Sequence, residues 1–169
     1  MRTPVYELHI RPMFTATDRD HMIARGHGLN LWSYDKVVEH AAEILEYLEG
    51  GTMPPPAFGG PWPKEWIDLF RRWKDGGRKG LELGAAVITV NRGPNSVTIK
   101  ATGTFPAAGY QGWLQLESES DTAKTYVLYF ERPDSPVAGT AQGFTLTERY
   151  LASDTRALFV HDSTGVQEH

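Results

Sequence analysis

The chain of 169 residues contains no cysteine and no long hydrophobic run. The absence of cysteine excludes disulfides, thiolate zinc sites, iron–sulfur clusters and thioether-linked haem. No stretch approaches the about 18 consecutive apolar residues of a membrane-spanning helix, and residues 1–9 hold no apolar signal-peptide core. We therefore expect a soluble, cytoplasmic protein with no membrane partner.

The chain also lacks a strong excess of charge of either sign. Its 17 basic and 21 acidic side chains give a net charge of −4, which predicts no basic surface for nucleic acid and disfavours anionic membranes. Strong catalytic motifs are absent as well, because there is no Gly-x-Ser-x-Gly elbow and no phosphate-cradling glycine loop. The composition, 40% hydrophobic, is sufficient for a buried core in one domain or in two small ones.

The composition changes near residue 80. Residues 1–80 contain five Ser or Thr, whereas residues 81–169 contain seventeen. Thr and Val suit a pleated surface and lose side-chain freedom in a helix, so this change predicts helices first and strands afterwards. The glycine-rich segment 75–80 indicates a helix end followed by a hinge or linker. We therefore expect an α+β chain with a helical part over residues 1–80 and a β part over residues 81–169.

Helical periodicity is clearest in two segments of the first part. Apolar residues recur on one face over 34–49, with Ser33 as a good N-cap, and a second helix is expected over 64–74, after Pro63. A shorter helix near 18–24 follows a segment at 6–10 that is expected to be extended. The second helix has a buried face that is predicted to consist of Trp66, Leu69, Phe70 and Trp73.

The sequence of the second part predicts six short strands separated by turn signals. Gly93-Pro94-Asn95 marks a hairpin, and the strand over 125–131 is apolar on both sides and is therefore expected to be central or covered by the helical part. Six such strands favour a small antiparallel β-sandwich, with the helical part packed on it. The predicted strands are 86–91, 96–104, 112–117, 125–131, 143–150 and 158–161.

Three segments of the first part form a recognisable series: Thr17-Asp18-Arg19-Asp20-His21, then Met53-Pro54-Pro55 in a loop, then the helix over 66–76. Over about residues 10–77 this series resembles the cytochrome c fold. The first segment occupies the place of the haem-attachment motif, the second matches the methionine loop and the third matches the last helix. The resemblance implies a cytochrome c-like helical fold. Because Thr17 and Asp20 stand where the two cysteines would be, it implies no covalent haem, and we expect no cofactor.

His21 and Met53 then have two interpretations. They could be axial ligands of a non-covalently held haem, or relics of the scaffold with Met53 filling a gap in the core, which we favour. His40 and Glu43 stand three residues apart on one helix, after His21 and His27, and are candidate metal ligands. The same pattern is typical of a solvent-facing helix surface, so we expect no metal site.

Aromatic side chains supply the candidate binding residues. Phe58 and Trp62 lie in the proline-rich loop 54–63, which is either a ligand for a polyproline-binding domain or, as we favour, a stiff loop between helices. Trp113 is a further binding candidate in the β part. The candidate catalytic residues are His21, Asp20 and His40.

Together these features favour a non-catalytic binding or assembly protein, of the kind that serves as an accessory subunit of a redox or biosynthetic enzyme. Its partner would be a protein or a small apolar ligand. The alternative is a small cofactor-independent enzyme acting on an apolar or aromatic molecule in a cleft between the two parts, where a His or Asp moves a proton. A constellation of Ser153, Asp154 and His161 is conceivable, although turns are rich in Ser and Asp for local reasons.

Overall fold

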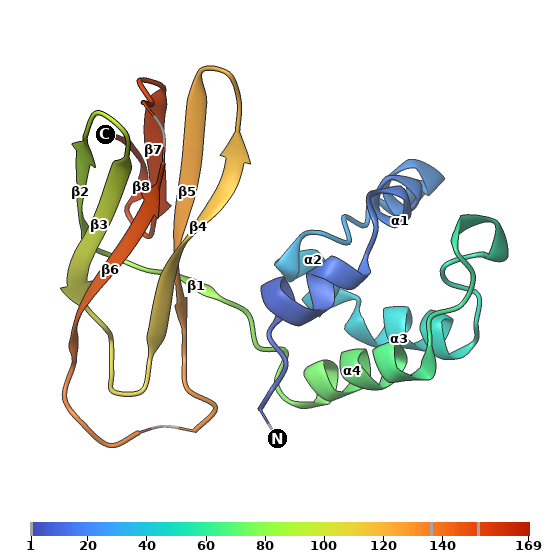
Figure 1. Ribbon diagram of the computed structural model, residues 1–169. Helices are drawn as coiled ribbons and strands as arrows, with labels where there is room; N and C mark the ends of the chain where they lie inside the picture. The colour runs from blue at the N-terminus through green and yellow to red at the C-terminus, as the bar shows by residue number, and fades with distance from the viewer. Residues whose placement is uncertain (1, 136, 152) are drawn as a thin grey trace. The chain divides into compact units, whose positions relative to one another are not determined.

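The computed structural model describes residues 2–135, 137–151 and 153–169. The chain divides into two compact units, Met1–Gly80 and Leu81–His169. Helices lie in the first unit and strands in the second, so the predicted mixture of N-terminal helices and C-terminal strands is confirmed (Figure 1). Within the described residues no helix has the length and apolar character needed to cross a membrane.

The described part of the helical unit contains four α-helices: α1 (Ala16–Met22), α2 (Tyr34–Glu39), α3 (Ala41–Glu49) and α4 (Lys64–Asp75). The helix predicted over 34–49 is divided at His40, whose backbone leaves the helical region with φ −103° and ψ 12°. Shorter helical turns lie at Tyr6–Ile10, Arg11–Met13, Ile23–His27 and Pro56–Phe58.

The extended conformation predicted for residues 6–10 is wrong, since this segment is a helical turn. Its Tyr and Ile residues have strand propensity, but tertiary contacts outweigh it. The Tyr6 hydroxyl donates to the Leu31 carbonyl at 2.7 Å, and the backbone N–H of His9 donates to the Val5 carbonyl at 2.9 Å. The turn thereby places Tyr6 in the core.

Aromatic side chains dominate the core of the helical unit. Trp73 is fully buried on α4, and its ring lies 5.7 Å from the Tyr6 ring and 5.3 Å from the Phe70 ring. Burial of side chains this large is the main contribution to stability in a unit of this size. The aliphatic and sulfur-containing core residues are Ile10, Met13, Leu29, Leu31, Val37, Ala41, Ile44, Leu45, Leu48 and Met53.

The glycine-rich segment 75–80, predicted as a hinge, is tied to the helical unit. The Tyr34 hydroxyl donates to the Arg78 carbonyl at 2.7 Å, and the Trp73 indole N–H donates to the Lys79 carbonyl at 2.9 Å. Lys79 is only 5% exposed. Gly77 and Arg78 take positive φ values of 95° and 55°, which turn the chain back toward the core after α4.

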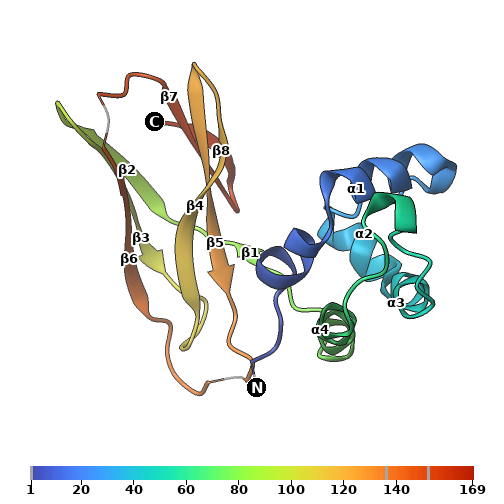
Figure 2. The same ribbon diagram turned by 45° about the vertical axis from the view of Figure 1, so that its right-hand side comes forward.

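Among the residues described in the β unit, eight strands form two sheets (Figure 2). Each of the six predicted strands is present; the two that were not predicted, β1 and β8, are two and four residues long. One sheet has the order β1-β5-β7-β8 with β4 also paired to β5, and the other has the order β2-β3-β6. The strands are β1 (Glu82–Leu83), β2 (Val87–Arg92), β3 (Val97–Thr104), β4 (Gln111–Glu119), β5 (Ala123–Glu131), β6 (Gly143–Tyr150), β7 (Ala157–Asp162) and β8 (Gly165–Glu168).

One strand pair departs from the predicted antiparallel arrangement. β5 and β7 are parallel, with Tyr126 opposite Val160, while the other pairs are antiparallel. The reason is topological: after β5 the chain enters the other sheet as β6 and then returns beside β5, and such a crossover permits a parallel pair that a tight hairpin cannot make. β5 is paired on both sides, as its two apolar faces predict.

The core of the β unit draws on both sheets. Val97, Ile99 and Ala101 on β3 are buried while the residues between them are more exposed, as the predicted alternation requires. On β5, the Phe130 ring lies against two glycines: a Cβ at Gly112 would stand 3.0 Å from Phe130 Cδ1, and one at Gly84 would overlap the ring. The remaining core members are Phe105, Leu114, Tyr126, Leu128, Phe144, Leu158 and Val160.

Candidate functional site

The helical unit contains a cleft of about 390 Å³, which we call the α1–α3 cleft. The volume lies at the lower end of the about 300–1,000 Å³ typical of small-molecule sites. Five apolar and five polar side chains share the lining, a mixture that can bury a ligand and orient it through a few polar contacts. The lining residues are His21, Met22, Leu29, His40, Glu43, Ile44, Tyr47, Thr52, Met53 and Pro55.

The end of α1 provides His21 and Met22. Its start is fixed by a capping box, in which Thr15 Oγ1 accepts from the Asp18 N–H at 3.1 Å and Asp18 Oδ2 accepts from the Thr15 N–H at 2.8 Å. Because α1 is only seven residues long, a fixed first turn also sets the rotation of its last turn. The cap thus directs His21 and Met22 to the cleft wall.

The loop after α3 provides Met53. Gly51 takes a φ of 66°, which favours glycine, and the N–H of Thr52 donates to the Tyr47 carbonyl at 3.1 Å. Met53 is 8% exposed, and together with His21 it lines both the α1–α3 cleft and an adjoining side cavity of about 20 Å³. The structure therefore brings these two sequence-predicted residues to one place.

A polar triplet on one face of the α2–α3 region completes the wall. His40 Nδ1 lies 3.2 Å from Glu43 Oε2, and the Tyr47 hydroxyl donates to Glu43 Oε1 at 3.4 Å. The spacing of three and four residues places the three side chains one above another on the helix surface. Both carboxylate oxygens of Glu43 are thus engaged at the cleft wall.

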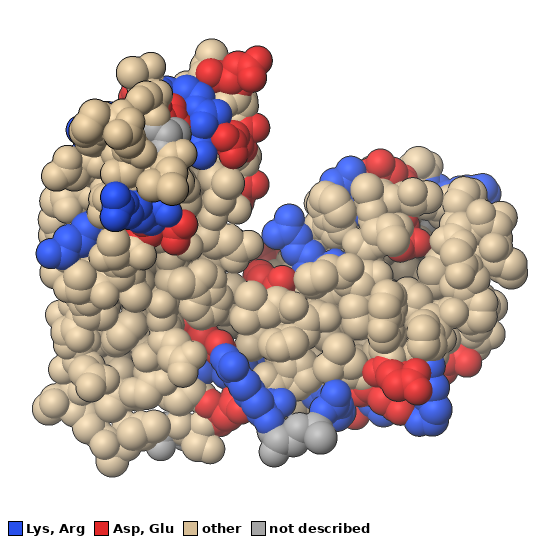
Figure 3. Space-filling model, in the orientation of Figure 1, with Lys and Arg blue, Asp and Glu red and all other residues tan. Residues whose placement is uncertain are grey.

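The charges around the cleft are of one sign. Its lining and that of the side cavity include the carboxylates of Glu43 and Asp18, and no Lys or Arg among the described residues. Asp18 is buried and accepts hydrogen bonds from Thr15. On the face in view in Figure 3, most charged side chains of the helical unit lie around its margin and the centre is largely uncharged. Glu43 is therefore the carboxylate that a ligand in the cleft would meet.

Two exposed rings accompany the cleft. Tyr47 lines it directly, Phe58 lines the side cavity, and each is 44% exposed. The Phe58 ring lies 5.1 Å from the His21 imidazole, centroid to centroid. Phe58 was predicted as a binding residue from its loop, whereas nothing in the local sequence distinguishes Tyr47 from an ordinary helix-surface residue.

The two loop-and-helix tryptophans have burial opposite to that expected. Trp62 is 7% exposed and packs on Phe14 at 5.0 Å, while Trp66, predicted to be core, is 43% exposed. The Trp62 and Phe70 rings both pack on Phe14, so Trp62 takes the core position that was expected for Trp66. Burial removes the reason for which Trp62 was a binding candidate, since its ring is not presented to a ligand.

The remaining candidates lie outside the cleft. Asp20 pairs with Arg19 at 2.6 Å at the surface, and Trp113 is half-buried on β4 of the other unit. The side chain of His27 lies outside the described residues. Among the side chains that the structure describes, no three of His, Asp and Glu are placed to share a metal ion, so His40 and Glu43 stand as a pair.

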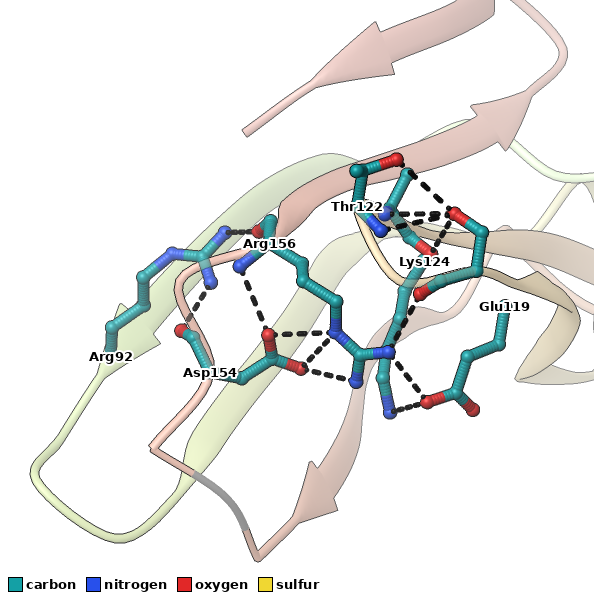
Figure 4. A network of polar contacts seen from close by, with 8 residues as sticks. Arg92, Glu119, Thr122, Lys124, Asp154 and Arg156 are labelled. Carbon is teal, nitrogen blue, oxygen red and sulfur yellow. Dashed lines mark hydrogen bonds and ion pairs between the residues drawn. The ribbon is translucent and has the colours of Figure 1, made fainter.

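A polar network in the β unit was not predicted (Figure 4). Arg156 binds both carboxylate oxygens of Asp154, and its Nη2 atom lies 2.8 Å from Asp154 Oδ2. Its Nη1 atom lies 2.9 Å from Glu119 Oε1, which Lys124 Nζ also contacts at 3.2 Å. The Arg156 guanidinium holds the pKa of Asp154 well below its usual range. Arg92 binds the Asp154 carbonyl at 2.9 Å.

Both carboxylates of the network are held by cations, so the network fixes the chain before β7. It also rules out the conceivable Ser153 constellation, because Asp154 is committed to Arg156 and the Ser153 hydroxyl donates to the Pro94 carbonyl at 2.5 Å. Local sequence could not reveal the network, since its members come from β2, β4, β5 and the segment before β7.

No protein-family model, curated protein or solved structure gives a significant match to this chain. The chemistry of the cleft therefore carries the functional inference. Its imidazoles can accept or donate hydrogen bonds, its carboxylate can hold a positive charge, and its apolar side chains can bury a hydrophobic body.

Proposed function

We propose that this protein is a non-catalytic binding protein whose helical unit takes up a small ligand in the α1–α3 cleft. The observation that supports this most directly is the cleft itself, in which buried Ile44, Leu29 and Met53 meet the polar side chains of His40 and Glu43 in one cavity. Apolar side chains that line an open cleft leave hydrophobic surface in contact with water, and a bound ligand would remove that surface from water.

We further infer that the helical unit is a cytochrome c-like scaffold without attached haem, and that the β unit is a small β-sandwich. The joint placement of His21 and Met53 around one cavity supports the first inference, and the core shared by two sheets supports the second. Thr17 lines the side cavity at a position where thioether chemistry would need a cysteine. Such a scaffold, relieved of its redox group, suits an accessory role beside a redox or biosynthetic enzyme.

Methionine methyl groups offer a direct test. With ¹³C-methyl methionine labelling, a panel of small apolar and amphipathic molecules is titrated into the full chain. Binding in the cleft is expected to shift the resonances of Met22 and Met53, which line it, and to leave that of Met13, a core residue outside the lining, unchanged. Failure of every molecule to shift Met22 and Met53, or equal shifts at Met13, would overturn the proposal.

Haem binding is tested separately. Haemin titrated under reducing conditions is expected to give no saturable Soret shift, because no Lys or Arg among the described lining residues could bind its propionates. A stoichiometric spectrum that is lost in both His21→Ala and Met53→Ala would instead identify the ligand as non-covalent haem.

The alternative function, a cofactor-independent enzyme, has one observation in its favour. The His40 imidazole is oriented by Glu43 at 3.2 Å, and both face the cleft, as a general base and its orienting carboxylate do. In that case His40→Gln would abolish turnover of a bound ligand without weakening its binding, whereas a binding protein returns every ligand chemically unchanged.

A further inference from the structure

We propose that the α1–α3 cleft binds an apolar organic cation, an ammonium group attached to an aromatic or aliphatic body. This inference rests on the proposed binding function and names the chemical class of the ligand. Two independent features of the cleft point to it: the sign of the charge on its wall, and the rings and thioethers that surround that charge.

Glu43 differs from its neighbours in how its charge is compensated. Among the described ion pairs of the helical unit, Glu39 is paired with Lys36 at 2.9 Å and Glu49 with Arg71 at 2.7 Å. Glu43 is paired with His40, which is charged only when protonated. Because no Lys or Arg is among the described lining residues, the cleft wall presents a carboxylate that a bound cation can neutralise and that a bound anion would meet as repulsion.

The Tyr47 ring strengthens the preference for a cation at the same point. Its hydroxyl donates to Glu43, so the ring is held beside the carboxylate, and it is 44% exposed. An ammonium group over the face of an exposed ring is attracted by the ring quadrupole. Carboxylate and ring together recognise a positive charge more specifically than either would alone.

The rest of the cleft suits an apolar body. Leu29, Ile44 and Met53 are all less than 9% exposed and form its hydrophobic lining. The Met53 thioether is polarisable and packs well against aromatic rings. Beyond it, Phe58 lines the side cavity. A ligand with its charge at Glu43 and Tyr47 would therefore lay a ring or short alkyl chain toward Met53.

Three indole probes with nearly the same shape and different charge test the proposal. Tryptamine is a cation, tryptophol is neutral and indole-3-acetate is an anion. Each is titrated into the full chain at pH 7.5 and low salt by calorimetry, with the Met22 and Met53 methyl resonances reporting the site. We expect tryptamine to bind about tenfold more tightly than tryptophol and indole-3-acetate to bind most weakly.

A matched pair of variants isolates the carboxylate. Glu43→Gln keeps the shape and removes the charge, and it is expected to weaken tryptamine about tenfold while changing tryptophol less than twofold. Glu46→Gln is the control, because Glu46 is exposed on the same helix and does not line the cleft; it should leave both affinities unchanged. Equal loss of tryptamine binding in both variants would overturn the role of Glu43.

The outcomes separate the two proposals. If tryptophol or indole-3-acetate shifts the Met53 resonance at least as strongly as tryptamine does, the cleft binds ligands but the proposed preference for a cation is wrong. If the wider panel shifts Met22 and Met53 and none of the three indoles does, this ligand class is wrong and the binding function stands. If nothing shifts these methyl groups, the binding function fails and the present inference fails with it.

Discussion

The helical unit and the β unit use aromatic side chains in different ways. In the helical unit, buried rings such as Trp73, Phe70 and Trp62 coexist with exposed rings at Tyr47 and Phe58 beside a cavity. In the β unit, the rings at Phe105, Phe130 and Phe144 contact one another directly, with centroids 4.5–5.3 Å apart, inside the shared core.

The difference follows from how each unit closes. Paired strands fix every side chain to one face or the other, so inward residues meet across the core with little choice. Short helices joined by loops have no common register, and their packing leaves a space where α1, α3 and the Met53 loop meet. The irregular unit therefore offers a cleft with a mixed polar and apolar lining, while in the regular unit the network around Arg156 holds the segment before β7.

The largest expected effect tests which rings hold the helical unit together. Trp73→Ala and Trp62→Ala should each destabilise it by about 3–5 kcal/mol, because both rings are buried and their removal leaves a large cavity. Trp66→Ala should cost about 1–2 kcal/mol, since its ring is 43% exposed and makes one edge contact with Trp62. Urea unfolding followed through the Met13 methyl resonance measures all three; a cost for Trp66→Ala equal to that for Trp62→Ala would contradict the packing described.

The second prediction concerns the β unit and acid. The pKa of Asp154 is lowered in the folded state by hydrogen bonds from Arg156, so its ionised form stabilises the fold above about pH 4, and that stabilisation is lost as the pH falls below the ordinary Asp value of about 3.9. Asp154→Asn should lower the melting temperature at pH 7 and show a smaller further loss between pH 5 and pH 3 than the wild type.

The control for this profile is Asp121→Asn, a carboxylate exposed in the turn between β4 and β5. The melting temperature of this variant should equal that of the wild type at pH 7, pH 5 and pH 3. If Asp154→Asn lost as much stability on acidification as the wild type, the network around Arg156 would not be the source of the acid sensitivity.

The smallest expected effect tests the boundary between the units. Trypsin should cleave slowly after Lys79 under native conditions, because that residue is 5% exposed and its carbonyl accepts from Trp73. Tyr34→Phe removes the hydrogen bond to the Arg78 carbonyl, worth about 1 kcal/mol, and should accelerate cleavage at Arg78 and Lys79 several-fold. Mass spectrometry of the first fragments decides; a first cut after Lys79 in the wild type would restore the hinge interpretation.

Periodicity predicted most of the secondary structure, since a strand such as 97–104 alternates strictly and the helix over 64–74 repeats every three to four residues. It could not predict the parallel pairing of β5 with β7, which depends on the path of β6. Nor could it assign Trp62 and Trp66 correctly, because the direction taken by the preceding loop decides which of two rings one turn apart is buried.

The candidate site was only partly accessible from sequence. His21, Met53, His40 and Glu43 carried recognisable spacing or a resemblance, whereas Tyr47 became a candidate only once α3 was seen to form a wall of the cleft. The proline-rich loop indicated that Phe58 and Trp62 mattered without indicating that one ring is exposed and the other is buried. Spacing along the chain identifies side chains with suitable chemistry, and the packing of the loops decides which of these side chains face a ligand.

The two glycines against Phe130 constrain how this protein can change over evolution. Gly84 and Gly112 approach one ring, and neither has the positive φ that usually explains why a glycine is retained. Their value lies in lacking a side chain where an aromatic edge needs the room. Divergent copies of this chain could therefore exchange Gly84 for alanine only in lineages where position 130 had already shrunk to a smaller residue, whereas alanine at position 112 would require the rings of Phe105 and Phe130 to shift by a few tenths of an ångström.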